Sequence, residues 1–220
     1  ATNEWTWMKG GPGSVASYGT KGVASVANNP IGRTENSCGW TDRSGNLWFF
    51  GGQIQADLSN DMWKYDPLIN QWTWMGGGFT AAVYGTKGVS HPLNLPGVRA
   101  PYCKWTDQSG NFWMFGGLIG LGIAELYNDM WKYDPTIFEW TWMGGKENGT
   151  SYFGTKCVPD KANFPSGRME NRACWTDLCG NFWFFGGASR GIAGDPMNDL
   201  WKYDPVLNIW TWISGDDIPN

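Results

Sequence analysis

The stretch NDMWKYDP, residues 60–67, returns unchanged at residues 128–135 and as NDLWKYDP at residues 198–205. In each copy the Trp and the Tyr are two residues apart, so they share one face of an extended strand. The closing Asp-Pro ends that strand, because Pro has no N–H for the ladder, and starts a turn. A Trp-Thr-Trp triplet follows every copy, and a further triplet stands at residues 5–7. The chain is therefore a tandem repeat of extended segments.

The rest of the repeat predicts four short strands per unit. In the first unit the first strand runs from Arg33 to Thr41, and a tight turn with a freely rotating Gly leads to the second, Leu47–Phe50. The third strand is Asp61–Tyr65 and the fourth is Gln71–Met75. Aromatic residues suit these pleated surfaces, and helical periodicity is absent. The fold class predicted is all-β, with antiparallel sheets that pack through aromatic layers.

Composition supports this interpretation and excludes several classes of protein. The 220 residues include 17 Trp, all within the repeat, whereas charged residues make up only 16% and the net charge is −4. Disordered chains have few aromatics. Nucleic-acid binders carry a basic face, which is missing here, so no nucleic-acid partner is expected. No stretch approaches the ~18 apolar residues of a membrane span, so membrane insertion is not expected.

These motifs resemble the kelch repeat, in which each unit forms one blade of a β-propeller. The resemblance rests on Gly-Gly after an aromatic strand, on Asn-Asp-x-Trp-x-Tyr-Asp, and on the Trp about seven residues later. It covers essentially the whole chain. It implies kelch-type blades similar to the central domain of galactose oxidase, as one region over residues 1–220. The expected parts are an extra N-terminal strand at 4–9, blade 1 at about 32–76, blade 2 at about 98–144 and blade 3 at about 167–214.

The repeat is longer than an ordinary kelch unit of about 50 residues. The excess lies in the connection Gly76–Val98 and its counterparts, which carry a Tyr-Gly-Thr-Lys block (Phe-Gly-Thr-Lys in the third copy). Because this block recurs, we expect it to be architectural. The long unit is similar to kelch variants of secreted bacterial proteins, which implies an extracellular or cell-surface location.

Three blades are too few to close a propeller ring, which typically needs four to eight. An open arc would expose an aromatic face at each end. We therefore expect part of a larger or oligomeric propeller, closed by additional repeats or by self-association. A two-fold dimer would make six blades, although each chain would then carry one redundant strand. Head-to-tail filaments are the other outcome of such faces.

The sequence predicts no catalytic residue, no metal and no cofactor. His91 is the only histidine and is expected in a solvated loop, and a G-x-S-x-G elbow is missing. The copper-radical oxidases among kelch propellers need two His, so one His argues against that activity. Five Cys occur without a C-x-x-C pair. Cys174 and Cys179 either bridge a hairpin or, like the others, are free thiols.

Three arginines that open the first strand of each unit are candidate ligand-binding residues: Arg33, Arg99 and Arg168. They could surround the mouth of the propeller's central channel and bind an anion, as the sialic-acid propellers of the family suggest. The alternative is a blade-building role, which fits their presence in every unit and is favoured. The same choice applies to the lysines of the Tyr-Gly-Thr-Lys block.

Loops that break the repeat are the other candidates, because binding residues concentrate on variable loops of a rigid scaffold. The loops between the second and third strands supply Asp57, Glu125, Arg190 and Asp195. The alternative is that these loops vary in sequence without binding any ligand.

Two further loop features have simpler readings. The turn aspartates resemble a sialidase Asp-box with altered spacing, and we expect Asx-type turns there instead. Asn148 opens an N-glycosylation sequon, which matters only in a source that glycosylates secreted proteins.

The function expected is a non-catalytic extracellular scaffold that binds protein or glycan or assembles with itself. A sugar-binding or sialic-acid-type kelch enzyme or lectin is the alternative, and a head-to-tail filament subunit is the second.

Overall fold

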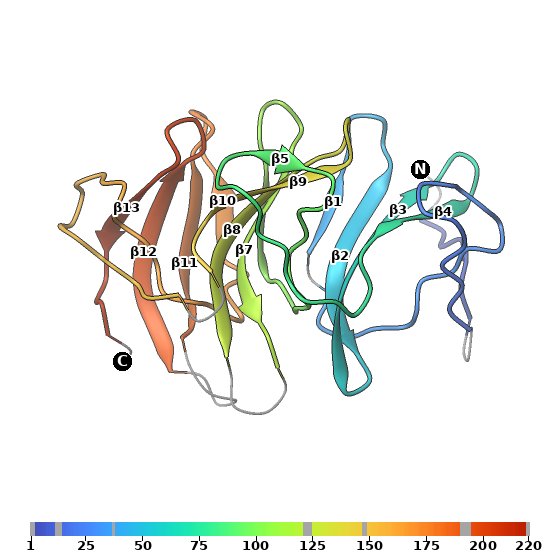
Figure 1. The fold of residues 1–220 in the computed structure, drawn as a ribbon, viewed down its shortest axis with the longest axis horizontal. Coiled ribbons are helices and arrows are strands. Elements are labelled where there is room, and N and C mark those ends of the chain that lie inside the picture. Colours follow the sequence, from blue (N-terminus) through green and yellow to red (C-terminus); the bar gives the residue numbers. More distant parts are fainter. Residues whose placement is uncertain are drawn as a thin grey trace.

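The computed structural model describes residues 3–11, 15–36, 38–120, 125–146, 149–189 and 195–218. Within these residues the chain is all-β, with thirteen strands in three antiparallel sheets. The sheets stand side by side along an arc, with the two termini near opposite ends (Figure 1). This arrangement is consistent with the blades of a β-propeller.

Each sheet is built from four consecutive strands in chain order, and the middle one has a fifth at its edge. Blade 1 consists of β1 (Gly39–Thr41), β2 (Leu47–Ile54), β3 (Asp57–Asp66) and β4 (Gln71–Gly76). Blade 2 consists of β6 (Cys103–Thr106), β7 (Phe112–Leu118), β8 (Leu126–Asp134) and β9 (Glu139–Gly144), with β5 (Ser90–His91) beside β9. Blade 3 consists of β10 (Cys174–Thr176), β11 (Phe182–Ala188), β12 (Pro196–Asp204) and β13 (Ile209–Ser214).

The second and third strands of each blade are longer than the sequence predicts. In blade 1 the ladder continues past Phe50, because Gly51 and Gly52 adopt φ of 66° and 103° and form a bulge. Pairing resumes beyond the bulge and ends at a two-residue turn between Ile54 and Asp57. Asp57 therefore lies at the start of a strand, where the sequence predicted a loop.

The first strand of each blade is shorter than predicted. In blade 1 only an isolated bridge between Thr34 and Gln53 precedes β1. Glu35 then takes a φ of 51°, and Glu170 takes a φ of 59° at the same place in blade 3. Because this left-handed conformation interrupts an extended ladder, the strand that was expected from Arg33 begins at Gly39.

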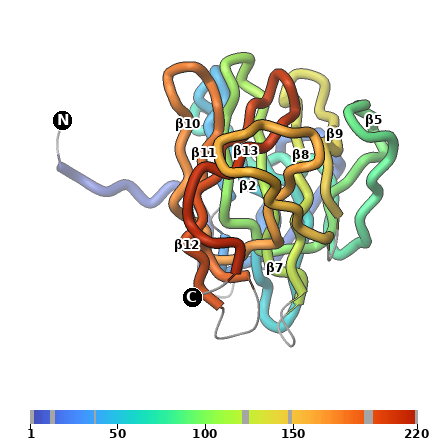
Figure 2. The backbone as a smooth tube through the Cα atoms, turned by 90° about the vertical axis from the view of Figure 1, so that its left-hand side faces the viewer, coloured from blue at the N-terminus to red at the C-terminus, as the bar shows by residue number. Residues whose placement is uncertain are grey.

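The extra strand expected at residues 4–9 is wrong: the structure has no strand there. In the three blades, the Trp-Thr-Trp strand pairs with the NDxWKYD strand of its own sheet, as Trp72 does with Tyr65. The N-terminal triplet pairs with none of the described strands. It extends from the body of the molecule (Figure 2) with Trp5 fully exposed.

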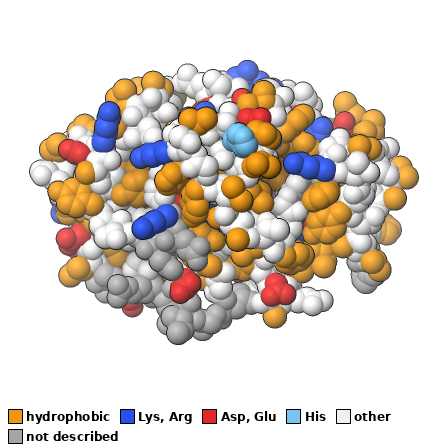
Figure 3. Space-filling view, viewed as in Figure 1, with side chains coloured by type: hydrophobic (Ala, Val, Ile, Leu, Met, Phe, Trp, Pro, Cys, Tyr) orange, Lys and Arg blue, Asp and Glu red, His pale blue; other side chains and the backbone are white. Residues whose placement is uncertain are grey.

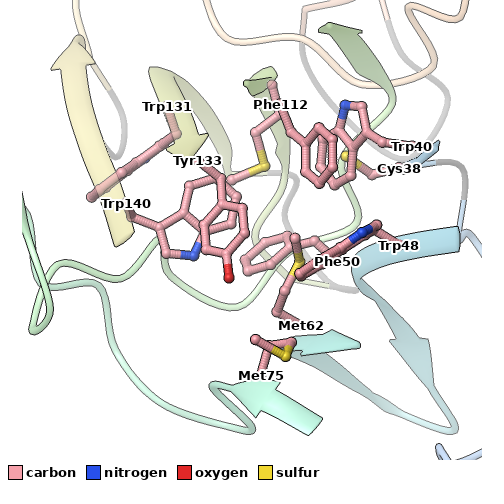
Figure 4. Packing of buried hydrophobic residues seen from close by; sticks show 11 residues of the cluster. Cys38, Trp40, Trp48, Phe50, Met62, Met75, Phe112, Trp131, Tyr133 and Trp140 are labelled. Carbon is pink, nitrogen blue, oxygen red and sulfur yellow. The ribbon is translucent and has the colours of Figure 1, made fainter. Parts of the chain in front are cut away.

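The core lies between the blades rather than within them. Trp40 of blade 1 stacks on Phe112 of blade 2, with ring centroids 5.2 Å apart and an interplanar angle of 7° (Figure 4). Trp105 repeats this contact on Phe182 of blade 3, at 5.2 Å and 8°. Because aromatic rings bury large apolar areas, these layers contribute most of the hydrophobic stabilisation between successive sheets.

Candidate functional site

The arginines of the first and second copies lie inside the blades. Arg33 donates two hydrogen bonds to the carboxylate of Asp61, at 2.5 and 2.9 Å. Arg99 is fully buried and binds Asp129 with the same two distances. Burial alone would lower the pKa of Arg99, but the Asp129 carboxylate raises it above the ordinary value. These contacts match the blade-building role, and a ligand would have to displace a buried carboxylate.

The Tyr of the Tyr-Gly-Thr-Lys block completes the same network. The Tyr18 hydroxyl donates to Asp61 at 3.0 Å, and Tyr84 does so to Asp129 at 3.0 Å. Burial and the nearby carboxylate raise the pKa of Tyr18 to about 12. The Lys of the block lies over the outer strand, and in blade 3 the Lys156 ammonium is 4.5 Å from the ring centre of Trp212. These contacts serve the packing of the blade.

Blade 3 departs from this network. Phe153 replaces the Tyr, so the Asp199 carboxylate loses one donor. Arg168 donates to Asp199 through Nη2 and to Ser166 through Nη1. Asp199 Oδ1 and Arg168 Nε are buried and have no partner among the described residues. Burial raises the pKa of Asp199 and lowers that of Arg168, which makes this the least satisfied polar core of the three blades.

The turn aspartates hold the hairpins together, as the sequence predicts. Both oxygens of Asp177 accept hydrogen bonds, from Asn181 and from the indole N–H of Trp183 at 2.8 Å. Partial burial would raise the pKa of Asp177, but these hydrogen bonds outweigh it and lower the pKa to about 2. Asp42 makes the equivalent contacts with Asn46 and Trp48. These carboxylates already accept hydrogen bonds within the hairpin, so their role is to stabilise the turn.

A groove on the hairpin rim brings two of the loop candidates together. It measures about 390 Å³ and is lined by Ala56, Asp57, Leu58, Phe79, Val98, Ile119 and Gly120. Asp57 is the charged residue of this lining. Glu125 joins its edge, because the Ile119 N–H donates to the Glu125 carbonyl at 3.0 Å. We call this set of residues the rim groove.

Sequence reasoning missed the apolar wall of the rim groove. Phe79 and Val98 come from the long connection between blades 1 and 2, which the repeat pattern marks as architectural. Phe79 has no counterpart in the other copies, so the departure from the repeat was the signal that could have found it. Asp195 is exposed before β12 and lies at the hairpin of blade 3. Arg190 and the sequon residue Asn148 lie outside the described residues.

The outer face of blade 3 is uncovered. Trp40 and Trp105 are 6% and 4% exposed, whereas the equivalent Trp175 is 53% exposed. Phe185 is likewise 44% exposed, although its counterpart Phe115 is fully buried. Apolar side chains reach both ends of the arc on the face drawn in Figure 3. Equivalent residues are thus core where another blade packs on them and surface on blade 3, on whose outer face no described sheet packs.

His91 and the five cysteines are the remaining candidates from the sequence. His91 is exposed and lies in β5, paired with Trp140, rather than in the predicted loop. All five cysteines are free thiols. In the described part of the chain, no three His, Cys, Asp or Glu side chains are grouped so that they could hold a metal ion. A membrane-crossing helix is also absent from that part.

Comparisons with known proteins show the fold. No protein-family model matches the sequence, and no curated protein matches it. A solved structure titled "Structure of YjhT" aligns with a TM-score of 0.51 over 84% of this chain, at 16% identity. The chain spans 53% of the length of that structure. At this identity the likeness supports a propeller-like all-β fold, and the specific assignment to the kelch family stays a prediction.

Proposed function

We propose that this chain is a non-catalytic, extracellular segment of a kelch-type propeller that acts as an assembly and binding scaffold. The observation that carries the proposal is the uncovered aromatic face of blade 3, whose equivalents in blades 1 and 2 are buried interfaces. An apolar face of this kind on a protein surface marks an interaction site.

The interfaces inside the chain support a choice of partner for this face. Trp40 and Trp105 each stack on the first aromatic residue of the second strand in the next blade. The residue that holds this place in blade 1 is Leu47, which is itself exposed on the uncovered opposite end. The two ends of one chain therefore carry the two sides of such an interface, and the N-terminal segment at Met8 would give way to the outer strand of the docked copy. We infer that a second copy of this chain docks head to tail, with its Leu47 face on Trp175.

Such a heterologous contact closes a ring if the rotation permits and otherwise makes a filament. Two copies would give six blades. The solved structure that resembles this chain is about twice as long as the aligned part, which fits closure by as much structure again. Further repeats in one longer polypeptide would cover the same faces by the same contacts.

The rim groove supports the binding half of the proposal. It combines an apolar wall with the Asp57 carboxylate, on the side of the blades where the hairpins differ between copies. The expected partners are protein or glycan. The sugar-binding alternative would be favoured if a glycan panel showed a ligand whose binding is abolished by Asp57→Asn.

The experiment that tests assembly is the solution mass of the 220-residue chain by light scattering. We expect twice the 24.5 kDa of one chain, or a larger series of multiples. The double variant Trp175→Ser/Phe185→Ser should return it to a single chain without loss of folding, because both side chains are exposed. Leu178→Ser is the matched control, since Leu178 is fully exposed but lies on a turn away from this face. A wild-type chain that stays monomeric at high concentration would overturn the proposal.

A further inference from the structure

The thiol of Cys103 points from blade 2 toward blade 3. Cys103 and Trp105 are two apart on β6, so they share a face of the strand. Trp105 stacks on Phe182 of blade 3, which fixes that face as the one turned to blade 3. Cys103 is fully buried there, in the aromatic cluster between the two blades.

The thiol of Cys174 points in the opposite sense. Cys174 immediately precedes Trp175 on β10, so the two side chains lie on opposite faces. Because Trp175 faces the uncovered end, Cys174 faces back toward blade 2. It packs against the same cluster as Cys103, and its Sγ is 3.5 Å from the carbonyl oxygen of Lys104, the neighbour of Cys103. Cys103 and Cys174 thus pack in one cluster at the interface where β6 and β10 lie next to each other.

The other interface offers an internal comparison. Cys38 shares the face of Trp40 and points toward blade 2, as Cys103 points toward blade 3. The residue that precedes the key Trp in blade 2 is Lys104, where blade 3 has Cys174. The position opposite Cys38 is therefore a lysine, Lys104. Among the five cysteines, two face each other only between blades 2 and 3.

We propose that Cys103 and Cys174 form an oxidative modification site, at which a low-molecular-weight disulfide converts them to a cross-link between blades 2 and 3. The Cys174 thiolate attacks the small disulfide, forms a mixed disulfide and releases one small thiolate. The Cys103 thiol, on losing its proton, then displaces the second small thiol and closes the Cys103–Cys174 bond. The two protein thiols are oxidised and the small disulfide is reduced to two thiols, so electrons and protons balance.

The surroundings of the pair suit these roles. The neighbouring Cys103 thiol lowers the pKa of Cys174 to about 6, and partial burial opposes this shift. Cys174 is also only partly buried, so a small oxidant can reach it. Burial raises the pKa of Cys103, which suits a residue that reacts second and only with its neighbour.

The test uses the full chain with its two exposed cysteines replaced, Cys157→Ser/Cys179→Ser, to prevent links between molecules. The protein is incubated with oxidised glutathione, denatured, labelled with N-ethylmaleimide and analysed by intact mass and peptide mapping. We expect one labelled thiol, Cys38, and a Cys103–Cys174 cross-linked peptide. The oxidised form should also melt at a higher temperature than the reduced form.

Single changes in this background separate the steps. Cys38→Ser should leave the cross-link intact, which makes it the matched control. Cys103→Ser should stop at a glutathione adduct on Cys174, and Cys174→Ser should show neither adduct nor cross-link. Three labelled thiols after oxidation of the background protein, or a cross-link that involves Cys38, would overturn the proposal. Because this readout is made on the unsubstituted pair, it does not depend on folding of the single variants or on self-assembly.

Discussion

The side-chain amide of Asn70 donates a hydrogen bond to the backbone carbonyl of Met8 at 3.0 Å. Asn208 makes the same contact with Met143, also at 3.0 Å, where the turn of blade 3 meets the outer strand of blade 2. Met8 and Met143 hold the same place after their Trp-Thr-Trp triplets. The N-terminal segment thus contacts blade 1 as the outer strand of a preceding blade would, although it forms no strand of its own.

The middle turn lacks this asparagine, and Phe138→Asn should stabilise the protein. Tyr65 and Tyr203 donate to Asn70 and Asn208 at 2.8 Å, whereas the buried Tyr133 hydroxyl has no partner among the described residues. Phe138 also holds a φ of 61°, which Asn tolerates better. The gain of one hydrogen bond is worth about 1 kcal/mol, seen as a higher midpoint in urea unfolding.

Phe138→Ala is the control for this change. It removes the same exposed ring but supplies no acceptor for Tyr133, and it keeps a side chain unsuited to positive φ. It should therefore not stabilise the protein. Equal effects of Asn and Ala would contradict the role of the hydrogen bond.

Phe153→Tyr should repair the polar core of blade 3. The Phe153 ring packs on Trp201 at 5.0 Å, close to the 5.2 Å between Tyr18 and Trp63, so a hydroxyl added there would point at Asp199. The new donor should bring about 1–2 kcal/mol, because its acceptor is a buried carboxylate with an unpaired oxygen. Calorimetry should show a rise of about 2–4 °C for each kcal/mol.

The reciprocal change Tyr84→Phe provides the comparison. It removes the 3.0 Å hydrogen bond to Asp129 and should lower the melting temperature by a similar amount. If Phe153→Tyr destabilised the chain while Tyr84→Phe had no effect, the network would not contribute as described.

The turn carboxylates should make the fold sensitive to acid. Hydrogen bonds lower the folded-state pKa of Asp177 to about 2, below its unfolded value of about 3.9. A lowered pKa stabilises the fold above the unfolded value, and this contribution is lost as the pH falls from about 4 to 2. Asp177→Asn should therefore flatten the decline of the melting temperature over this range.

Asp57→Asn is the control in that experiment, because Asp57 is exposed at the start of β3 and lies outside the hydrogen-bonded turns. Its acid profile should follow that of the wild-type chain. Identical profiles for all three proteins would remove the turn carboxylates as a source of acid sensitivity.

Equivalent tryptophans in successive blades should contribute different amounts to the free energy of unfolding. Trp105→Ala empties a buried layer and should reduce the free energy of unfolding by about 3–5 kcal/mol. Trp175→Ala changes a half-exposed residue and should reduce that of a single chain by less than half as much. Urea unfolding at low protein concentration measures both values. Similar losses would mean that the blade 3 face is already covered.

Much of the fold could be predicted from local pattern. The recurring NDxWKYDP stretch, the Gly-Gly pairs and the Trp-Thr-Trp triplets indicate short strands and their order, because alternation and turn chemistry act over a few residues. The limits of the strands could not be predicted in the same way. The Gly51–Gly52 bulge extends the ladder and the left-handed Glu35 interrupts it, and neither conformation follows from the alternation of side chains along one strand.

The candidate site shows the same division. The sequence singled out Asp57 and Glu125 as residues outside the repeat, but only the packed blades bring them to the edge of one groove with Phe79. The repeated arginines look alike in sequence. Their burial against Asp61 and Asp129, and the incomplete pairing of Arg168, depend on side chains far away along the chain.

The sequence by itself determined the repeat, the all-β class and the aromatic layers, because each is encoded within one unit. Only the tertiary structure decided which equal residues become core and which become surface. Trp105 is buried and Trp175 is exposed because burial is a property of the neighbouring blade. In the same way, Cys103 and Cys174 become a pair only where two blades turn those faces toward each other.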